Sequence, residues 1–96
     1  MLHLVYQAPI QNAVLERISL GDDVVFLENA VLGLLDKGRL SHALAGLCES
    51  CQLFVLSDEL NARGVQADEL VSGIEPIDNA KLVALAVKNT TIQTWS

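Results

Sequence analysis

Aromatic residues, cysteines and long apolar runs are all scarce in this chain. Aromatics make up 4% of its 96 residues, and two cysteines are too few for a disulfide framework. The longest apolar runs, 24–27 and 82–87, fall well short of the roughly 20 residues that cross a bilayer. Residues 1–20 also lack a basic start followed by an apolar core and a cleavage site. We therefore expect a cytoplasmic protein with no membrane contact.

Positive charge is scarce as well. Six Lys and Arg face twelve Asp and Glu, which gives a net charge of −6. A protein that binds nucleic acid by itself needs a basic surface, because phosphate neutralisation supplies most of the non-specific binding energy. Direct binding of nucleic acid is therefore disfavoured. With 51% hydrophobic residues and no Pro-, Ser- or Gln-rich tract, residues 1–96 are expected to fold as one domain.

Short apolar runs alternate with segments of helical period, which is typical of an α/β protein. Runs 24–27 and 53–56 are apolar at every position, which suits parallel strands covered by helices on both faces. We predict a flavodoxin-like three-layer sandwich with a mainly parallel sheet of about five strands. The predicted strands are 1–6, 24–27, 53–56, 74–77 and 91–95, and the predicted helices are 11–20, 29–35, 40–48, one that starts at 57, and 79–88.

Local signals set the expected ends of these elements. Residues 8–9 (Ala-Pro) should end the first strand, and Gly21 should close the first helix. Ser57 is a candidate helix cap, and Gly64 is placed to adopt the left-handed conformation after that helix. Pro76 indicates that the fourth strand lies at an edge.

Ligands of parallel sheets usually bind at the carboxyl ends of the strands. No loop there has the glycines of a dinucleotide fingerprint or a P-loop, so no cofactor is predicted. Glu28, Asp58 and Glu59 could converge for acid-base or metal chemistry, but without a histidine nearby we favour helix capping and solvated loop charge. Residues 21–23 (Gly-Asp-Asp) are interpreted as a helix-to-strand turn.

Cys48 and Cys51 are the candidates for thiol chemistry. A redox C-x-x-C opens a helix, where the dipole lowers the first thiol's pKa. Cys48 instead continues the apolar stripe of Leu44 at a helix end, beside Glu49, and Cys51 leads into the amino end of a strand. We favour two semi-buried thiols that behave as small hydrophobes. With His42 they would supply three zinc ligands, but the fourth is missing.

Three further residues each allow a structural and a functional interpretation. His3 lies between apolar residues in the first strand and is interpreted as a hydrogen-bonded core histidine rather than an acid or base. Trp95 either closes the core or anchors a subunit contact. Arg63 follows Glu59 by four residues and should pair with it on the surface, unless it reaches a partner subunit.

Several segments together resemble the TusB/DsrH family of small sulfur-relay subunits. The most specific is Asp58 to Gly64, which reads Asp-x-Leu-x-Ala-Arg-Gly, together with a tryptophan next to the C-terminus. The other segments are 1–3 (Met-Leu-His), 21–24 (Gly-Asp-Asp-Val), 28–31 (Glu-Asn-Ala-Val), 55–57 (Val-Leu-Ser), 77–78 (Ile-Asp) and 92–95 (Ile-Gln-Thr-Trp).

The resemblance implies a DsrEFH-like fold and a place among TusC/DsrF-like and TusD/DsrE-like sister subunits in a dimer of heterotrimers. Such complexes relay persulfide sulfur, either for 2-thiolation of the tRNA wobble uridine or in cytoplasmic sulfur oxidation. The sulfur-carrying cysteine resides chiefly in a sister subunit, and some DsrH-type members also have one in the first helix. The matching position here is Val14, which cannot carry a persulfide. We therefore expect a non-catalytic subunit, with Arg63 and Trp95 as candidate interface residues.

Two other classes stay open from the sequence. The chain could be an autonomous thiol or persulfide carrier that uses Cys48 or Cys51. It could also be a small-ligand-binding flavodoxin-like domain that acts alone, and the isolated chain could be a homodimer. A pocket at the carboxyl ends of the strands would be needed for the ligand-binding class.

Overall fold

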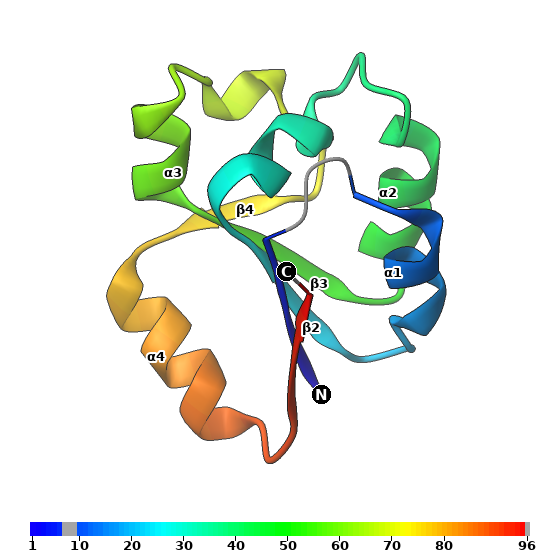
Figure 1. Cartoon of the computed structure of the whole chain (residues 1–96), viewed down its shortest axis with the longest axis vertical. Coiled ribbons are helices and arrows are strands. Elements are labelled where there is room, and N and C mark those ends of the chain that lie inside the picture. Colours follow the sequence, from blue (N-terminus) through cyan, green and yellow to red (C-terminus); the bar gives the residue numbers. More distant parts are fainter. Residues whose placement is uncertain (7–9, 96) are drawn as a thin grey trace.

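The computed structural model describes residues 1–6 and 10–95, which form a five-stranded sheet with helices on both faces (Figure 1). The expected end of the first strand at residues 8–9 lies outside the described residues. The elements in chain order are β1 (Leu2–Val5), α1 (Asn12–Arg17), β2 (Asp23–Phe26), the 3-10 helix η1 (Glu28–Leu34), α2 (Ser41–Cys48), β3 (Gln52–Leu56), α3 (Ser57–Ala62), the 3-10 helix η2 (Ala67–Glu69), β4 (Glu75–Ile77), α4 (Asn79–Lys88) and β5 (Ile92–Trp95).

All five strands are parallel, and their order across the sheet is β4-β3-β2-β1-β5. The chain steps from β1 to β4 in one direction and then crosses to the other edge, where β5 pairs with β1. This reversal places α4 on the opposite side of the sheet from the other helices (Figure 1). The predicted α/β class, three layers and parallel sheet are confirmed, as is the edge position of the strand that contains Pro76.

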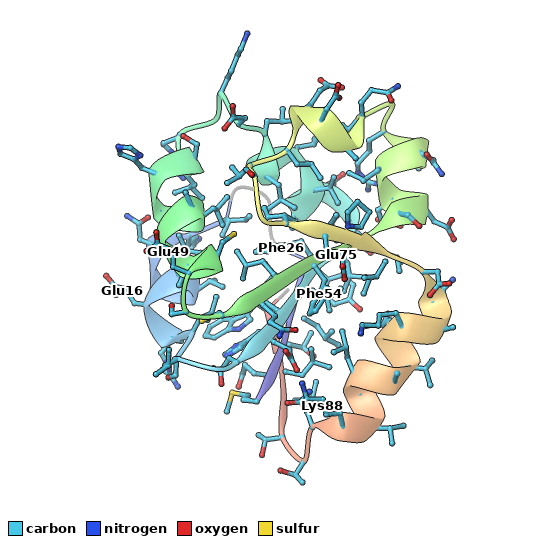
Figure 2. All side chains as sticks on the ribbon, turned by 180° about the vertical axis from the view of Figure 1, so that it is seen from behind. Glu16, Phe26, Glu49, Phe54, Glu75 and Lys88 are labelled. Carbon is cyan, nitrogen blue, oxygen red and sulfur yellow. The ribbon has the colours of Figure 1, made fainter. Side chains whose placement is uncertain are left out.

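Two hydrophobic cores flank the sheet, one on each face. Phe26 belongs to the core under α1, η1, α2 and α3, whereas its chain neighbour Val25 belongs to the core under α4. Both side chains are fully buried, and Figure 2 shows Phe26 and Phe54 in the interior while Glu16 and Glu49 lie at the periphery. Residues in a strand alternate between faces, so the continuous apolar run in β2 reflects covering on both sides.

Two predicted helix ends differ from the structure. The helix α1 ends at Arg17 because Ile18 is already extended (ψ 125°), so Gly21 does not close it. Gly21 instead has φ of 85° in the turn before β2, a conformation that glycine adopts without steric cost. Ser57 is the first residue of α3 and makes no capping hydrogen bond, since the capping position belongs to Leu56. Gly64 has the predicted positive φ, at 67°.

Replacing Gly46 by alanine should raise the free energy of unfolding by about 0.5–1 kcal/mol. Gly46 lies inside α2, where a Cβ would meet no atom within 4 Å, so alanine gains helix propensity without a clash. Gly21 is the matched control. A Cβ there would also meet no atom within 4 Å, but the positive φ of this residue would strain alanine. Urea unfolding of both variants checks this: Gly21→Ala should be destabilised, and equal shifts for the two would contradict it.

Candidate functional site

The two cysteines lie near the amino edge of the sheet. Cys48 is the last residue of α2 and is half-buried, and Cys51 is buried immediately before β3. Burial, together with the neighbouring Cys51, raises the pKa of the Cys48 thiol above its ordinary value. The Cys51 thiol donates a hydrogen bond to the backbone oxygen of Ser19 at 3.1 Å. Neither thiol has the helix N-terminus or free cation that would favour a reactive thiolate.

Both cysteines line a hollow of about 350 Å³ that also includes Lys88. Lys88 is not free to activate a thiol, because its Nζ lies 3.1 Å from Oδ2 of the buried Asp23. Asn89 donates to the same oxygen at 3.1 Å, so this carboxylate ties the end of α4 to the start of β2. Figure 2 shows Lys88 at this end of α4. The hollow therefore lies at the edge opposite to the one where ligands of parallel sheets usually bind.

The carboxyl edge also has a hollow, of about 380 Å³, between α3 and β4. It lies where β3 leads to a helix on one face and β4 to a helix on the other, which is the expected place for a ligand. Its lining contains no ionisable side chain and no cysteine; the residues are Ser57, Leu60, Asn61, Gly64, Val65, Gln66, Ala67 and Pro76. These groups can donate and accept hydrogen bonds but supply neither a nucleophile nor a general acid or base.

Arg63 connects α3 to η1 at the carboxyl edge. Its Nη1 lies 3.2 Å from Oε2 of Glu59, which confirms the predicted pair, and its Nη2 donates to Oδ1 of Asn29 at 3.0 Å. Within the described parts of the chain, no three His, Cys, Asp or Glu side chains gather closely enough to hold a metal ion. The arrangement that would have combined Glu28, Asp58 and Glu59 into a metal site is therefore not formed.

Glu28 has a φ of 52°, which is unfavourable for a residue with a Cβ. Glu28→Gly should raise the free energy of unfolding by about 0.5 kcal/mol, because relief of the left-handed strain exceeds the added flexibility of the unfolded chain. The matched control is Glu16→Gly in α1, where glycine should cost about 1 kcal/mol. Thermal or urea unfolding measures both, and a Glu28→Gly variant as destabilised as the control would contradict the strain.

A series of hydrogen bonds links Trp95 of β5, His3 of β1 and Asp22 in the turn before β2. The Nε1 of Trp95 donates to Nδ1 of His3 at 3.2 Å, and the two rings stack with centroids 6.4 Å apart. An indole N–H can only donate, so Nδ1 of His3 accepts and the ring proton is on Nε2. That Nε2 donates to Oδ2 of Asp22 at 2.9 Å. Both ring nitrogens are thus occupied and His3 is 1% exposed, which confirms a hydrogen-bonded core histidine.

The Asp22 carboxylate accepts hydrogen bonds from other groups besides His3. Burial raises the pKa of the Asp22 carboxyl, but hydrogen bonds from the Ser19 backbone at 2.9 Å and from His3, together with the nearby Met1 ammonium, outweigh burial and lower that pKa below its ordinary value. The carboxylate therefore holds the turn before β2 against β1, and through His3 it also holds β5.

Because the native pKa of Asp22 is lowered, its ionisation stabilises the fold above about pH 4. This stabilisation is lost as the pH falls from that value through the lower native pKa. Asp22→Asn should therefore lose stability at neutral pH and lose less than the parent on acidification. Urea midpoints measured across the acid range check this, and parallel pH curves for the two proteins would contradict it.

The sequence indicated His3 and Trp95 one at a time but not their connection. From the sequence alone, Asp22 is interpreted as part of a helix-to-strand turn, since no spacing rule links residues 3, 22 and 95. The signal that could have found it is the parallel sheet itself: β1 lies between β2 and β5, so residues at the start of β2 and in β5 flank His3. His3 cannot activate a nucleophile here, because the Trp95 indole already occupies the imidazole nitrogen that would act as a base.

Two solved structures share the fold over nearly the whole chain. The ychN protein from E. coli superposes with a TM-score of 0.80 at 14% identity, covering 98% of this chain and 97% of that one. A protein of unknown function from Methanobacterium thermoautotrophicum gives a TM-score of 0.73 at 16% identity, with coverage of 97% and 95%. At these identities the likeness establishes the fold alone.

Sequence relatives are more informative. Protein TusB from Shigella flexneri is 29% identical over 98 residues, covering 99% of this chain and 100% of that protein. Protein TusB from Erwinia tasmaniensis is 31% identical with the same coverage. Residues 5–92 match the model of the DsrH like protein family. The chain therefore belongs to the TusB/DsrH family, as the segments quoted from its sequence indicated.

Proposed function

We propose that this chain is a non-catalytic subunit of a heteromeric sulfurtransferase complex that relays persulfide sulfur for 2-thiolation of the tRNA wobble uridine. The observation that carries the proposal is Val14. By the family resemblance this residue matches the position in the first helix where some DsrH-type members have a cysteine, and it is 1% exposed within the core. A buried valine can neither accept sulfur nor present it to a partner.

The state of the two cysteines supports the same role. Cys48 has a raised pKa, and the buried Cys51 thiol donates a hydrogen bond to the Ser19 backbone oxygen, so neither is prepared to attack a persulfide. The polar hollow at the carboxyl edge adds no ionisable group. The chain therefore contributes surface to the complex, and the sister subunits contribute the reactive sulfur.

Exposed apolar side chains support an assembly with TusC/DsrF-like and TusD/DsrE-like subunits. Val83 and Val87 lie four residues apart on α4 and are 61% and 82% exposed, and Leu20 is 82% exposed. We retain Arg63 and Trp95 as candidate interface residues, since Trp95 lies on the edge strand β5 and the Arg63 side chain is partly exposed. The assembly proposed is a dimer of heterotrimers.

The charge of the chain favours a step upstream of the RNA. A net charge of −6 disfavours contact with phosphates, so tRNA binding is assigned to another protein of the relay. Thiolation of tRNA places the complex in the cytoplasm. In the described residues, no helix has the length and apolar character to span a membrane.

Deletion of the gene tests this function. Loss of the chain should abolish 2-thiouridine in digested tRNA, measured by mass spectrometry, and a Cys48→Ser/Cys51→Ser copy should restore it as well as the parent does. Normal 2-thiouridine in the deletion strain would overturn the proposal. If sulfur oxidation failed in that strain instead, the chain would belong to the sulfur-oxidation branch of the family.

A further inference from the structure

We infer that Cys48 and Cys51 form a reversible intrachain disulfide when the folded protein meets hydrogen peroxide. The hollow that both cysteines line together with Lys88 is then a redox modification site. The inference is independent of the sulfur relay proposed above. It rests on the local backbone, on the shared hollow and on the unequal burial of the two thiols.

The backbone keeps the two residues on one side of a helical turn. After Cys48 ends α2, Glu49 still has helical angles (φ −77°, ψ −25°), and the Cys51 amide donates to the Leu47 oxygen at 2.8 Å. Residues three apart in such a turn have Cβ atoms about 5–6 Å apart, whereas a disulfide needs about 3.5–4.5 Å. A closure of about 1–2 Å between the Cβ atoms therefore suffices. The side chains of the intervening Glu49 and Ser50 are exposed and do not block this movement, but the turn must keep or give up the hydrogen bond that the Gly21 amide donates to the Ser50 oxygen at 2.9 Å.

Access differs between the two thiols. Both line the hollow of about 350 Å³, which admits a molecule as small as hydrogen peroxide. Cys48 is half-buried and Cys51 is 7% exposed, so the peroxide reaches Cys48 first. The backbone of Gly73 lies against Cys48, since a Cβ on Gly73 would be 2.9 Å from its Sγ. This cover disfavours a disulfide with a second protein molecule.

The chemistry balances with one peroxide for each pair of thiols. The Cys48 sulfur attacks one peroxide oxygen, the O–O bond breaks, and the departing hydroxide takes the thiol proton as water. The Cys48 sulfenic acid is then attacked by the Cys51 sulfur; its S–O bond breaks, and that hydroxide leaves with the Cys51 proton as a second water. The sulfurs lose two electrons in total, and the peroxide gains them.

The same features make the reaction slow and stoichiometric rather than catalytic. Burial and the neighbouring Cys51 raise the pKa of Cys48, so only a small fraction of this thiol is ionised at neutral pH. Cys51 must also give up its hydrogen bond to the Ser19 oxygen. A thiol is a weak donor, so this loss opposes closure only slightly.

Intact-mass spectrometry after peroxide treatment and thiol alkylation tests the inference. The native protein should lose two hydrogen atoms, resist alkylation at both cysteines and recover on reduction. Cys51→Ala should stop at a Cys48 sulfenic acid that dimedone traps, and Cys48→Ala should show no dimedone adduct. The two variants are matched controls, since each retains one thiol in the hollow.

The parent protein alone decides the outcome if a variant fails to fold. An intrachain disulfide that is the main product in native buffer supports a pair held within reach by the fold, even where it forms more slowly than in concentrated urea, because the raised pKa of Cys48 slows the first step only in the folded protein. Both cysteines fully alkylated after peroxide in native buffer would overturn the inference. So would a disulfide that forms only in urea, or a product dominated by linked dimers.

Discussion

Replacing His3 by alanine should lower the free energy of unfolding by about 2–4 kcal/mol. The loss has two parts. Removing a fully buried ring leaves a cavity, and it also leaves the Asp22 carboxylate and the Trp95 indole without their partner. Urea unfolding at neutral pH, followed by circular dichroism, measures the change.

His42→Ala is the matched control, because the other histidine of the chain is exposed on α2 and should cost less than about 0.5 kcal/mol. Trp95→Phe separates the contributions, since it keeps an aromatic ring and removes only the donor, for about 1 kcal/mol. If His3→Ala and His42→Ala cost the same, the series of hydrogen bonds through His3 would contribute nothing to the fold.

Val25→Asp and Phe26→Asp should each prevent cooperative folding. These neighbours on β2 are fully buried in different cores, so either aspartate places a carboxyl group in an apolar layer with no partner. Burial of such a group costs several kcal/mol, about as much as the whole stability of many domains of this size. The prediction is checked by the loss of a sigmoidal urea transition in both variants.

Gln93→Asp supplies the strand control, because Gln93 is exposed on the edge strand β5 and should tolerate the change. A sheet covered on one face would tolerate one of the two β2 substitutions. Folding of either Val25→Asp or Phe26→Asp with near-parent stability would therefore contradict the three-layer fold.

The apolar runs are the reason that much of the fold could be predicted. Short apolar runs such as 24–27 and 53–56 suit strands buried on both faces, and such strands favour a parallel sheet between two helical layers. The ends of the helices are harder to predict from the sequence. Gly21 is equally suited to close a helix or to open a tight turn, and the extended geometry of Ile18 decides between them only in the folded chain.

The site was predictable residue by residue but not as an arrangement. The pairing of Arg63 with Glu59 follows from a spacing of four in a helix, and so it was predicted. The hydrogen bonds from Arg63 to Asn29 and from Trp95 to His3 join residues 34 and 92 positions apart. Such contacts depend on strand order, which a single sequence with this pattern does not determine.

The placement of the thiols gives the family assignment its functional meaning. Membership alone is compatible with a sulfur carrier or with a supporting subunit. A buried Val14 in α1, a Cys48 thiol with a raised pKa and a buried Cys51 thiol that is hydrogen-bonded to the Ser19 oxygen favour the supporting role. The proposed peroxide disulfide would be a property of the same cysteines outside the relay.

Sulfur transfer by the reconstituted three-subunit complex tests the central proposal most directly. The complex is assembled with the parent chain, with the Cys48→Ser/Cys51→Ser chain, or without this chain, and labelled sulfur is followed from a persulfide donor to the acceptor protein. We expect transfer at the parent rate with the serine variant and failure of assembly and transfer without the chain. Loss of transfer with the serine variant, or undiminished transfer by the two sister subunits alone, would contradict a non-catalytic but required subunit.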